Sequence, residues 1–378
     1  MRRLLTMAMI LTIATTAFAQ AQRPFGSIDY VEGSATLMRA GKSLGEANIG
    51  DDVLPDDMLR TAGDGLVIIN LDRSTGMRGS LTIKPRTVIY IRLQADATGP
   101  KSTIDLIIGQ IGSKLAKLSG NPTLNVGTES VAMGVRGTAF NIATSVNGSI
   151  LIICTEGEVI STDGAATLTV PAGRAVEKKG SAMLRLVPVA ISSPETFERQ
   201  WIGEEIEAFK ANAPKAMANY EQRYSDLLGR FHTAFDPLQK SEILSKWIRE
   251  DVAGVRVNPN DPVTMREKRE MIGHIMEIRK ILFIFERIYY RILELEGIIS
   301  GTSMERTQLR PGFAVGDFIR KVRTEAPSLE RRMYLFRYAE KLYGIRNAGG
   351  AGLPGMGGSD EFFGSDDDFF GSGDNFDF

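Results

Sequence analysis

An arginine between two glycines is the most distinctive chemical feature of this sequence. The guanidinium of Arg136 is planar and permanently charged, so it can donate paired hydrogen bonds to a carboxylate or to backbone carbonyl oxygens. The flanking glycines and the Thr-Ala-Phe segment behind them predict a tight turn that enters a β-strand. The residues of this motif are Gly134, Val135, Arg136, Gly137, Thr138 and Phe140. We predict that Arg136 ties neighbouring turns together; the alternative is an exposed arginine that contacts a partner.

Residues of the types used in catalysis are scattered along the chain. His232 and His274 lie on predicted helices, away from any cysteine, nucleophile motif or second ligand at metal-binding spacing. Asp51 and Asp52 follow a glycine, where an aspartate favours a turn by bonding to its own backbone. No motif singles out a pair of carboxylates. We therefore predict a protein that is not an enzyme and binds neither metal nor cofactor, and keep an uncharacterised envelope hydrolase as the second alternative, after the one given below.

Charge and cysteine content narrow the class of protein. The 378 residues carry a formal net charge of −1, so the chain offers no overall basic surface for nucleic acid. The single cysteine, Cys154, has no partner for an intramolecular disulfide. It ends the continuous apolar run 150–154, which is typical of a strand covered on both faces. We predict a buried thiol that acts as a small apolar side chain, with intermolecular pairing as the alternative.

The first 21 residues have the pattern of a secretory signal. Arg2 and Arg3 precede the apolar run 4–13, and small residues follow as far as Ala21. The run is shorter than the roughly 20 residues that span a bilayer, so we expect cleavage after Ala19 or Ala21 rather than an anchor. The sequence thus predicts export across the inner membrane to the periplasm or envelope, with no membrane span after signal cleavage.

Between residues 22 and 187 the sequence predicts strands only. Short apolar or alternating runs recur, and Gly, Asp or Pro stands at the corners between them. This pattern favours a sandwich, barrel or solenoid of short strands over a parallel α/β sheet. The predicted strands are 31–38, 66–71, 81–84, 88–93, 104–109 and 124–126, with return strands near Ile152, Val159, Leu168 and Val176.

The order of motifs over residues 26–180 resembles the FecR-type periplasmic domain. The most specific element is Val-Arg-Gly-Thr-x-Phe at 135–140, with the Gly-x-Val strand at 157–159 behind it. The resemblance implies an all-β, non-enzymatic module that receives or relays a contact in the cell envelope. The other segments that carry it are 49–53, 59–61, Asp72, 83–87, 109–111 and 171–173.

One feature departs from the best-known members of this family. Those regulators place a cytoplasmic segment that handles a sigma factor, and then a membrane helix, before the β module. Here the predicted signal leads almost directly into the module. We therefore expect a secreted, non-catalytic envelope protein that uses the module for protein binding or scaffolding. A signal relay of the FecR anti-sigma type is the alternative.

After Pro188 the periodicity becomes helical. Prolines or N-capping residues predict helix starts at Pro194, Pro214 and Pro237, and a last helix from about Pro327. A long helix is predicted over residues 263–300, about 55 Å at 1.5 Å per residue. Its middle is apolar on several faces, which must be covered. A bundle of helices covers them in the simplest interpretation; a homo-oligomer through 263–300, or docking on an envelope protein, is the alternative.

The last stretch, 347–378, is rich in Gly, Asp and Phe and carries no Lys or Arg. Such a composition predicts disorder. Phenylalanines in a polar tail suggest short motifs that dock on a partner, and a passive linker is the alternative. The candidate docking residues are Phe362, Phe363, Phe369, Phe370, Phe376 and Phe378.

The chain is therefore predicted to be a multidomain α+β protein with segregated domains. A signal peptide (1–21) precedes a FecR-like all-β domain (22–187), a helical domain (188–346) and a disordered tail (347–378). The expected partners are envelope proteins.

Overall fold

The computed structural model describes residues 23–39, 42–96, 99–117, 123–135, 137–180, 182–190 and 192–347. Strands occupy the first half of this range, and long helices follow from residue 194 onward. The predicted class, an all-β region followed by helices, is confirmed. The domain limits drawn from the sequence stay a prediction.

The β region consists of two sheets of nine strands each among the described residues. The first, sheet A, has the order β18 (Arg185–Pro188), β17 (Arg174–Lys178), β14 (Ile150–Glu156), β13 (Ala139–Thr144), β10 (Gln110–Lys117), β7 (Met77–Ile83), β6 (Leu66–Leu71), β1 (Gly26–Glu32) and β4 (Asp52–Val53). The second, sheet B, has the order β16 (Thr167–Pro171), β15 (Glu158–Thr162), β12 (Ala132–Val135), β11 (Thr123–Gly127), β9 (Gly99–Ile108), β8 (Val88–Asp96), β5 (Asp57–Thr61), β2 (Ala35–Arg39) and β3 (Lys42–Glu46). Pairing is antiparallel except between β9 and β11.

Alternating side chains from both sheets form the core between them. In β6, Val67 and Ile69 are buried, and in β1 Ile28 is buried. In β14, alternate side chains enter two different apolar clusters. Ile152 and Cys154 enter the core between the sheets, whereas Leu151 and Ile153 lie in a separate cluster on the outer face. The predicted strand covered on both faces, with a buried Cys154 thiol, is confirmed.

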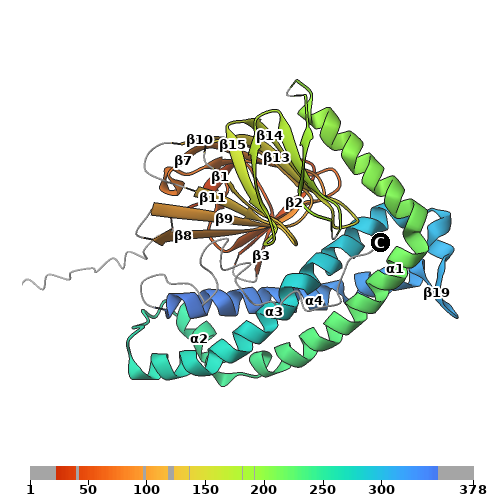
Figure 1. Cartoon of the computed structure of the whole chain (residues 1–378). Coiled ribbons are helices and arrows are strands. Elements are labelled where there is room, and N and C mark those ends of the chain that lie inside the picture. The colour runs from red at the N-terminus through yellow and green to blue at the C-terminus, as the bar shows by residue number, and fades with distance from the viewer. Residues whose placement is uncertain are drawn as a thin grey trace, which may run out of the picture.

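Four long helices follow in the described part of the chain: α1 (Pro194–Gln239), α2 (Glu242–Val252), α3 (Pro262–Ile299) and α4 (Val315–Ile345). In Figure 1 they run below and beside the strands, with α4 passing under the β region. The remaining elements of the described residues are η1 (Arg73–Thr75), η2 (Ser303–Arg306), β19 (Gln308–Arg310) and β20 (Phe313–Ala314).

Prolines misled the prediction of helix boundaries. We expected helix starts at Pro214, Pro237 and Pro327, but all three lie inside continuous helices. Each proline is on the exposed face of its helix, where the carbonyl that loses its N–H partner can bind water. By contrast, the predicted start of α3 is confirmed, because the Asp261 side chain accepts hydrogen bonds from the first backbone N–H groups.

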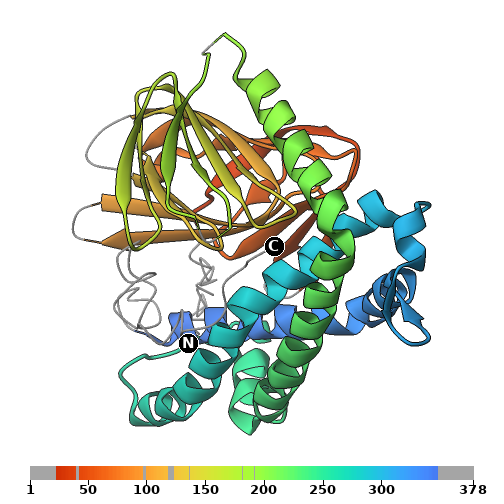
Figure 2. The same ribbon diagram turned by 45° about the vertical axis from the view of Figure 1, so that its right-hand side comes forward.

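The middle of α3 is covered within the chain. Phe285 stacks on Phe231 of α1 with ring centroids 5.3 Å apart, and Ile288 and Ile292 are also buried. Side chains of sheet B, including Met58 and Tyr90, belong to the same apolar cluster as these helices. The turned view shows α1 and α3 crossing beside the β region (Figure 2). A homo-oligomer through residues 263–300 stays a prediction.

Candidate functional site

The glycine-flanked motif lies where the chain passes from one sheet to the other. Gly134 and Val135 end β12 in sheet B, and Phe140 is buried in β13 of sheet A. Gly137 has a φ of 67°, a conformation that favours glycine. Arg136 lies outside the described residues. The position of the motif suits the structural corner that we expected, and the role of Arg136 itself stays a prediction.

The return turn packs directly on this corner. Gly157 has a φ of 72°, and a Cβ built on it would lie 2.9 Å from Cγ2 of Thr138 and 3.1 Å from the carbonyl oxygen of Gly137. Val159 pairs with Val135 of the motif strand. The two most specific segments of the predicted family pattern thus lie against each other.

The other candidates from the sequence are not brought together. The six tail phenylalanines lie outside the described residues. His232 is on α1 and His274 on α3. Burial, and then the charge of Arg332, lower the pKa of His232. Among the described residues, no group of three or more His, Cys, Asp or Glu side chains is placed to hold a metal ion.

Buried polar contacts instead join the helices to the β region. Glu198 of α1 is 1% exposed, and its carboxylate accepts hydrogen bonds from Lys84 Nζ at 2.6 Å and Asn141 Nδ2 at 2.8 Å. Further along α1, Glu205 accepts one from Ser145 Oγ at 2.9 Å. A buried carboxylate is costly unless it is paired in this way, so these contacts fix α1 in one position on sheet A.

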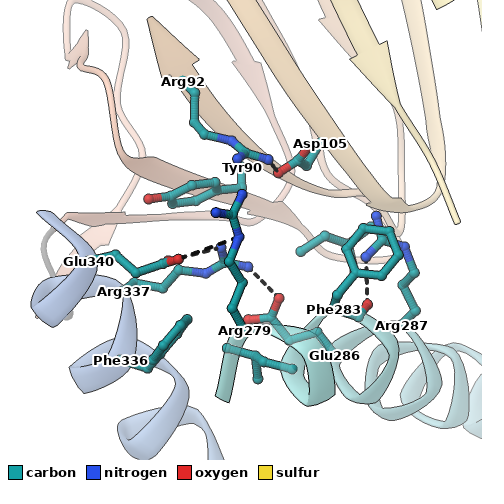
Figure 3. A pocket seen from close by; sticks show the side chains of 12 residues that line it. Tyr90, Arg92, Asp105, Arg279, Phe283, Glu286, Arg287, Phe336, Arg337 and Glu340 are labelled. Carbon is teal, nitrogen blue, oxygen red and sulfur yellow. Dashed lines mark hydrogen bonds and ion pairs between the residues drawn. The ribbon is translucent and has the colours of Figure 1, made fainter. Parts of the chain in front are cut away.

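A cluster of buried charges lies between sheet B and the helices, around a cavity of about 40 Å³ (Figure 3). Strands β8 and β9 contribute one wall, α3 the second and α4 the third. We call this group the charge cluster. Its members are Tyr90, Arg92, Asp105, Arg279, Glu286, Arg287, Arg337 and Glu340.

Arg337 of α4 is the centre of the charge cluster. It forms ion pairs with Glu286 of α3 and, at 3.6 Å, with Glu340. Its guanidinium also lies over the Tyr90 ring of β8, 4.2 Å from the centroid. Arg92 and Asp105 pair across β8 and β9. One side chain thus connects two helices and a sheet.

Burial controls the acid–base properties of the charge cluster. It raises the pKa of Glu286 and of Glu340, against the opposing charge of Arg337. Burial alone would lower the pKa of Arg337, but the two carboxylates outweigh it and raise that pKa. Burial lowers the pKa of Arg287, whose Nη1 donates to the carbonyl oxygen of Phe283 at 2.6 Å.

The charge cluster can hold the domains in register. Removing one partner of a buried ion pair leaves an uncompensated charge, which typically costs about 3–5 kcal/mol. The arrangement therefore penalises any sliding of α3 or α4 across sheet B. The sequence does carry a signal for this cluster that we did not use. Arg287 and Arg291 interrupt the apolar middle of α3, and Arg92 and Asp105 interrupt two apolar strands.

The fold and this site define a two-sheet β protein with a helical domain attached through buried ion pairs. Residues 60–160 match the family model described as FecR protein, so the chain carries a FecR domain. The resemblance drawn from the sequence is confirmed over this stretch, which is less than half of the chain. No curated protein matches the chain.

Two crystal structures are similar to part of the chain, each described as a candidate anti-sigma factor from Parabacteroides distasonis ATCC 8503. The first is 11% identical with a TM-score of 0.30, and covers 36% of this chain and 62% of its own. The second is 12% identical with a TM-score of 0.24, and covers 35% and 55%. The chain thus spans less than two thirds of either structure.

Within the part of the chain that the structure describes, no helix is both long and apolar enough to cross a membrane.

Proposed function

We propose that this protein is a secreted, non-catalytic component of the cell envelope that binds a protein partner through its FecR domain and helical domain acting as one body. The observation that carries the proposal is the charge cluster, in which Arg337 links α3, α4 and sheet B. A binding surface that spans both domains needs them held at a fixed angle. Buried, directional ion pairs provide that rigidity.

An exposed sheet edge supports a protein partner. Strand β3 ends the order of sheet B, so it has a neighbour on one side only among the described strands. All five of its residues are exposed, and Leu44 is 52% exposed. Unpaired backbone groups on an edge strand are a template for a strand from another chain.

In-cell photo-crosslinking tests this function. A photoreactive residue at Leu44 on β3 and another at Val255 beyond α2 sample the two domains, and one at the exposed Met183 serves as the control position. We expect one envelope protein, identified by mass spectrometry, to be captured from both domains and not from Met183. Failure of both positions to capture any protein would remove the ground for a binding role.

The FecR match favours a second function, the relay of a contact to a regulatory partner. A relay requires that the coupling of the domains changes the output, whereas a scaffold requires only that both surfaces are present. Loosening the charge cluster with Arg337→Met separates the two. If the protein is a scaffold, the variant should still crosslink the same partner at Leu44, and its affinity for that partner should fall only as far as the stability of the fold falls. If the protein is a relay, the variant should still crosslink that partner at Leu44 but should no longer crosslink a second, different partner at Val255.

A further inference from the structure

A second hollow lies between the two domains, away from the charge cluster. It is a groove of about 550 Å³, formed by strands and turns of the β region on one side and by α3 and α4 on the other. This volume is within the range of about 300–1,000 Å³ typical of ligand sites. Its lining includes Arg60, Arg86, Leu293, Glu294, Glu296 and Arg323.

Two of the three arginines in the groove are already paired. Arg60 bonds to Glu330 at 3.1 Å and lies over the Tyr290 ring at 5.6 Å. Arg323 bonds to Glu296 at 2.7 Å. The Arg86 guanidinium has no hydrogen bond or ion pair among the described residues, and its side chain is exposed. Arg86 is therefore the arginine of the groove that is available to a ligand.

The backbone at Arg86 is in an unfavourable conformation. Its φ is 55°, and the only other described non-glycine residue with positive φ is Asp56, at 69°. Aspartate tolerates this region, but arginine is not among the residues that favour it. Arg86 follows Pro85 in a turn, at the position where positive φ usually selects glycine or asparagine. Local strain of this kind is concentrated at functional sites.

Neighbouring glycines leave room for the Arg86 side chain. A Cβ built on Gly63 would lie 3.1 Å from Nη2 of Arg86, and one built on Gly297 of α3 would lie 3.7 Å from the same atom. The backbone N–H of Arg86 donates to the carbonyl oxygen of Ala62 at 2.9 Å. The guanidinium is thus held between the β region and α3, at the groove.

The rest of the groove offers an apolar side chain and a half-buried acid. Leu293 lines the groove and is half-buried, whereas Val88, Ile108 and Tyr290 behind it are only 1–4% exposed. Glu294 has one carboxyl oxygen, Oε2, that is buried without a hydrogen-bond partner. Burial raises the pKa of Glu294, against the charges of Arg291 and Arg86. The unpartnered Oε2 can accept a hydrogen bond from a backbone N–H group, so this side chain suits a peptide.

We propose that the groove binds an acidic peptide segment with aromatic side chains, and that residues 360–378 of this chain are that segment. Arg86 would pair with an aspartate carboxylate, and a phenylalanine ring would lie against Leu293. The segment repeats aspartate beside phenylalanine and contains no Lys or Arg to oppose Arg86. This occupant is independent of the envelope partner proposed above.

The chain between α4 and residues 360–378 is long enough for this segment to reach the groove. From Arg346 back to Arg323, α4 spans about 35 Å at 1.5 Å per residue. The 12 residues between positions 348 and 359 reach about 40 Å when extended at 3.3 Å each. The segment can therefore reach the groove from the far end of α4.

Titration of a synthetic peptide tests the proposal. The acceptor is the full-length chain with its six tail phenylalanines replaced by serine, and the ligand is a peptide of residues 358–378, followed by calorimetry. We expect saturable binding that is at least tenfold weaker for Arg86→Asn and unchanged for Arg199→Ala, a remote exposed arginine on α1. Asparagine tolerates positive φ, so Arg86→Asn should leave the melting temperature unchanged or higher.

Three results would overturn the proposal. Absence of peptide binding, or binding that Arg86→Asn does not weaken, removes the site. A fall of more than about 5 °C in the melting temperature of Arg86→Asn assigns Arg86 to domain packing instead. If the wild-type chain binds the added peptide as tightly as the serine variant, its own segment does not occupy the groove. None of these results affects the crosslinking test, so the two proposals fail separately.

Discussion

The guanidinium of Arg337 on α4 lies 4.2 Å from the centroid of the Tyr90 ring on β8 while it pairs with Glu286 on α3. These residues are far apart in the sequence, and their contact joins the helical domain to sheet B. Because Glu286 is 1% exposed, its charge depends on Arg337 for compensation.

Replacing Arg337 should therefore be costly. Arg337→Met keeps the aliphatic stem but leaves Glu286 buried without its counterion, so we expect a loss of about 3–5 kcal/mol in the free energy of unfolding by urea. As a matched control, Arg320→Gln removes an ion pair to Asp317 from an exposed arginine, and should change stability by less than about 0.5 kcal/mol. The double variant Arg337→Met/Glu286→Met should recover part of the loss. Equal effects of Arg337→Met and Arg320→Gln would contradict the central role of Arg337.

A hydrogen-bonded aspartate between the sheets predicts that the stability of the fold depends on pH. Asp163 directly follows β15 and accepts hydrogen bonds from Lys178 Nζ of β17 at 2.7 Å and from the Ala166 N–H at 2.9 Å. Burial alone would raise the pKa of Asp163, but these bonds outweigh it and lower that pKa. A lowered pKa means that the stabilisation is present above the unfolded value, near pH 4, and is lost as the pH falls through the folded value.

The variant Asp163→Asn tests this. We expect it to be less stable than the wild type by about 1–3 kcal/mol at pH 7, with the difference shrinking below about pH 4. Thermal unfolding at pH 7, 5 and 3 measures the difference. A gap of the same size at all three pH values would mean that the loss arises from packing and not from charge.

The turn behind the FecR motif predicts a strict need for glycine. A Cβ at Gly157 would lie 2.9 Å from Thr138, and its φ is 72°, so Gly157→Ala should cost about 1–3 kcal/mol. Gly203, in the middle of α1, has no atom within 4 Å of its built Cβ. Gly203→Ala should instead stabilise the protein by up to about 1 kcal/mol. Melting curves of the two variants should shift in opposite directions.

Substitution of Arg136 tests the role of the FecR motif. If its guanidinium ties neighbouring turns, Arg136→Ala in the full-length chain should lower the melting temperature while Leu44 still crosslinks to its partner. An unchanged melting temperature together with lost crosslinking would identify Arg136 as an exposed contact. The two interpretations drawn from the sequence are thereby separated.

The sequence determined the class of the β region because its signals are local. Short apolar runs between Gly, Asp and Pro corners predicted the strands, and the Val-Arg-Gly-Thr-x-Phe motif identified the FecR domain that the family match confirms. The continuous apolar run 150–154 also predicted a strand with two covered faces, because every side chain in such a run must be buried.

Only the tertiary structure decided what lies between the domains. A proline can start a helix, but it is also tolerated inside a helix when it faces solvent. The sequence alone therefore could not tell which of these roles Pro214 and Pro327 have. Charged residues in apolar segments look locally unfavourable. Arg92 becomes favourable only beside Asp105, and Glu286 only beside Arg337. Glu286 and Arg337 lie 51 positions apart, and their pairing depends on how α3 and α4 cross sheet B, which is fixed by packing over the whole surface rather than by any local pattern.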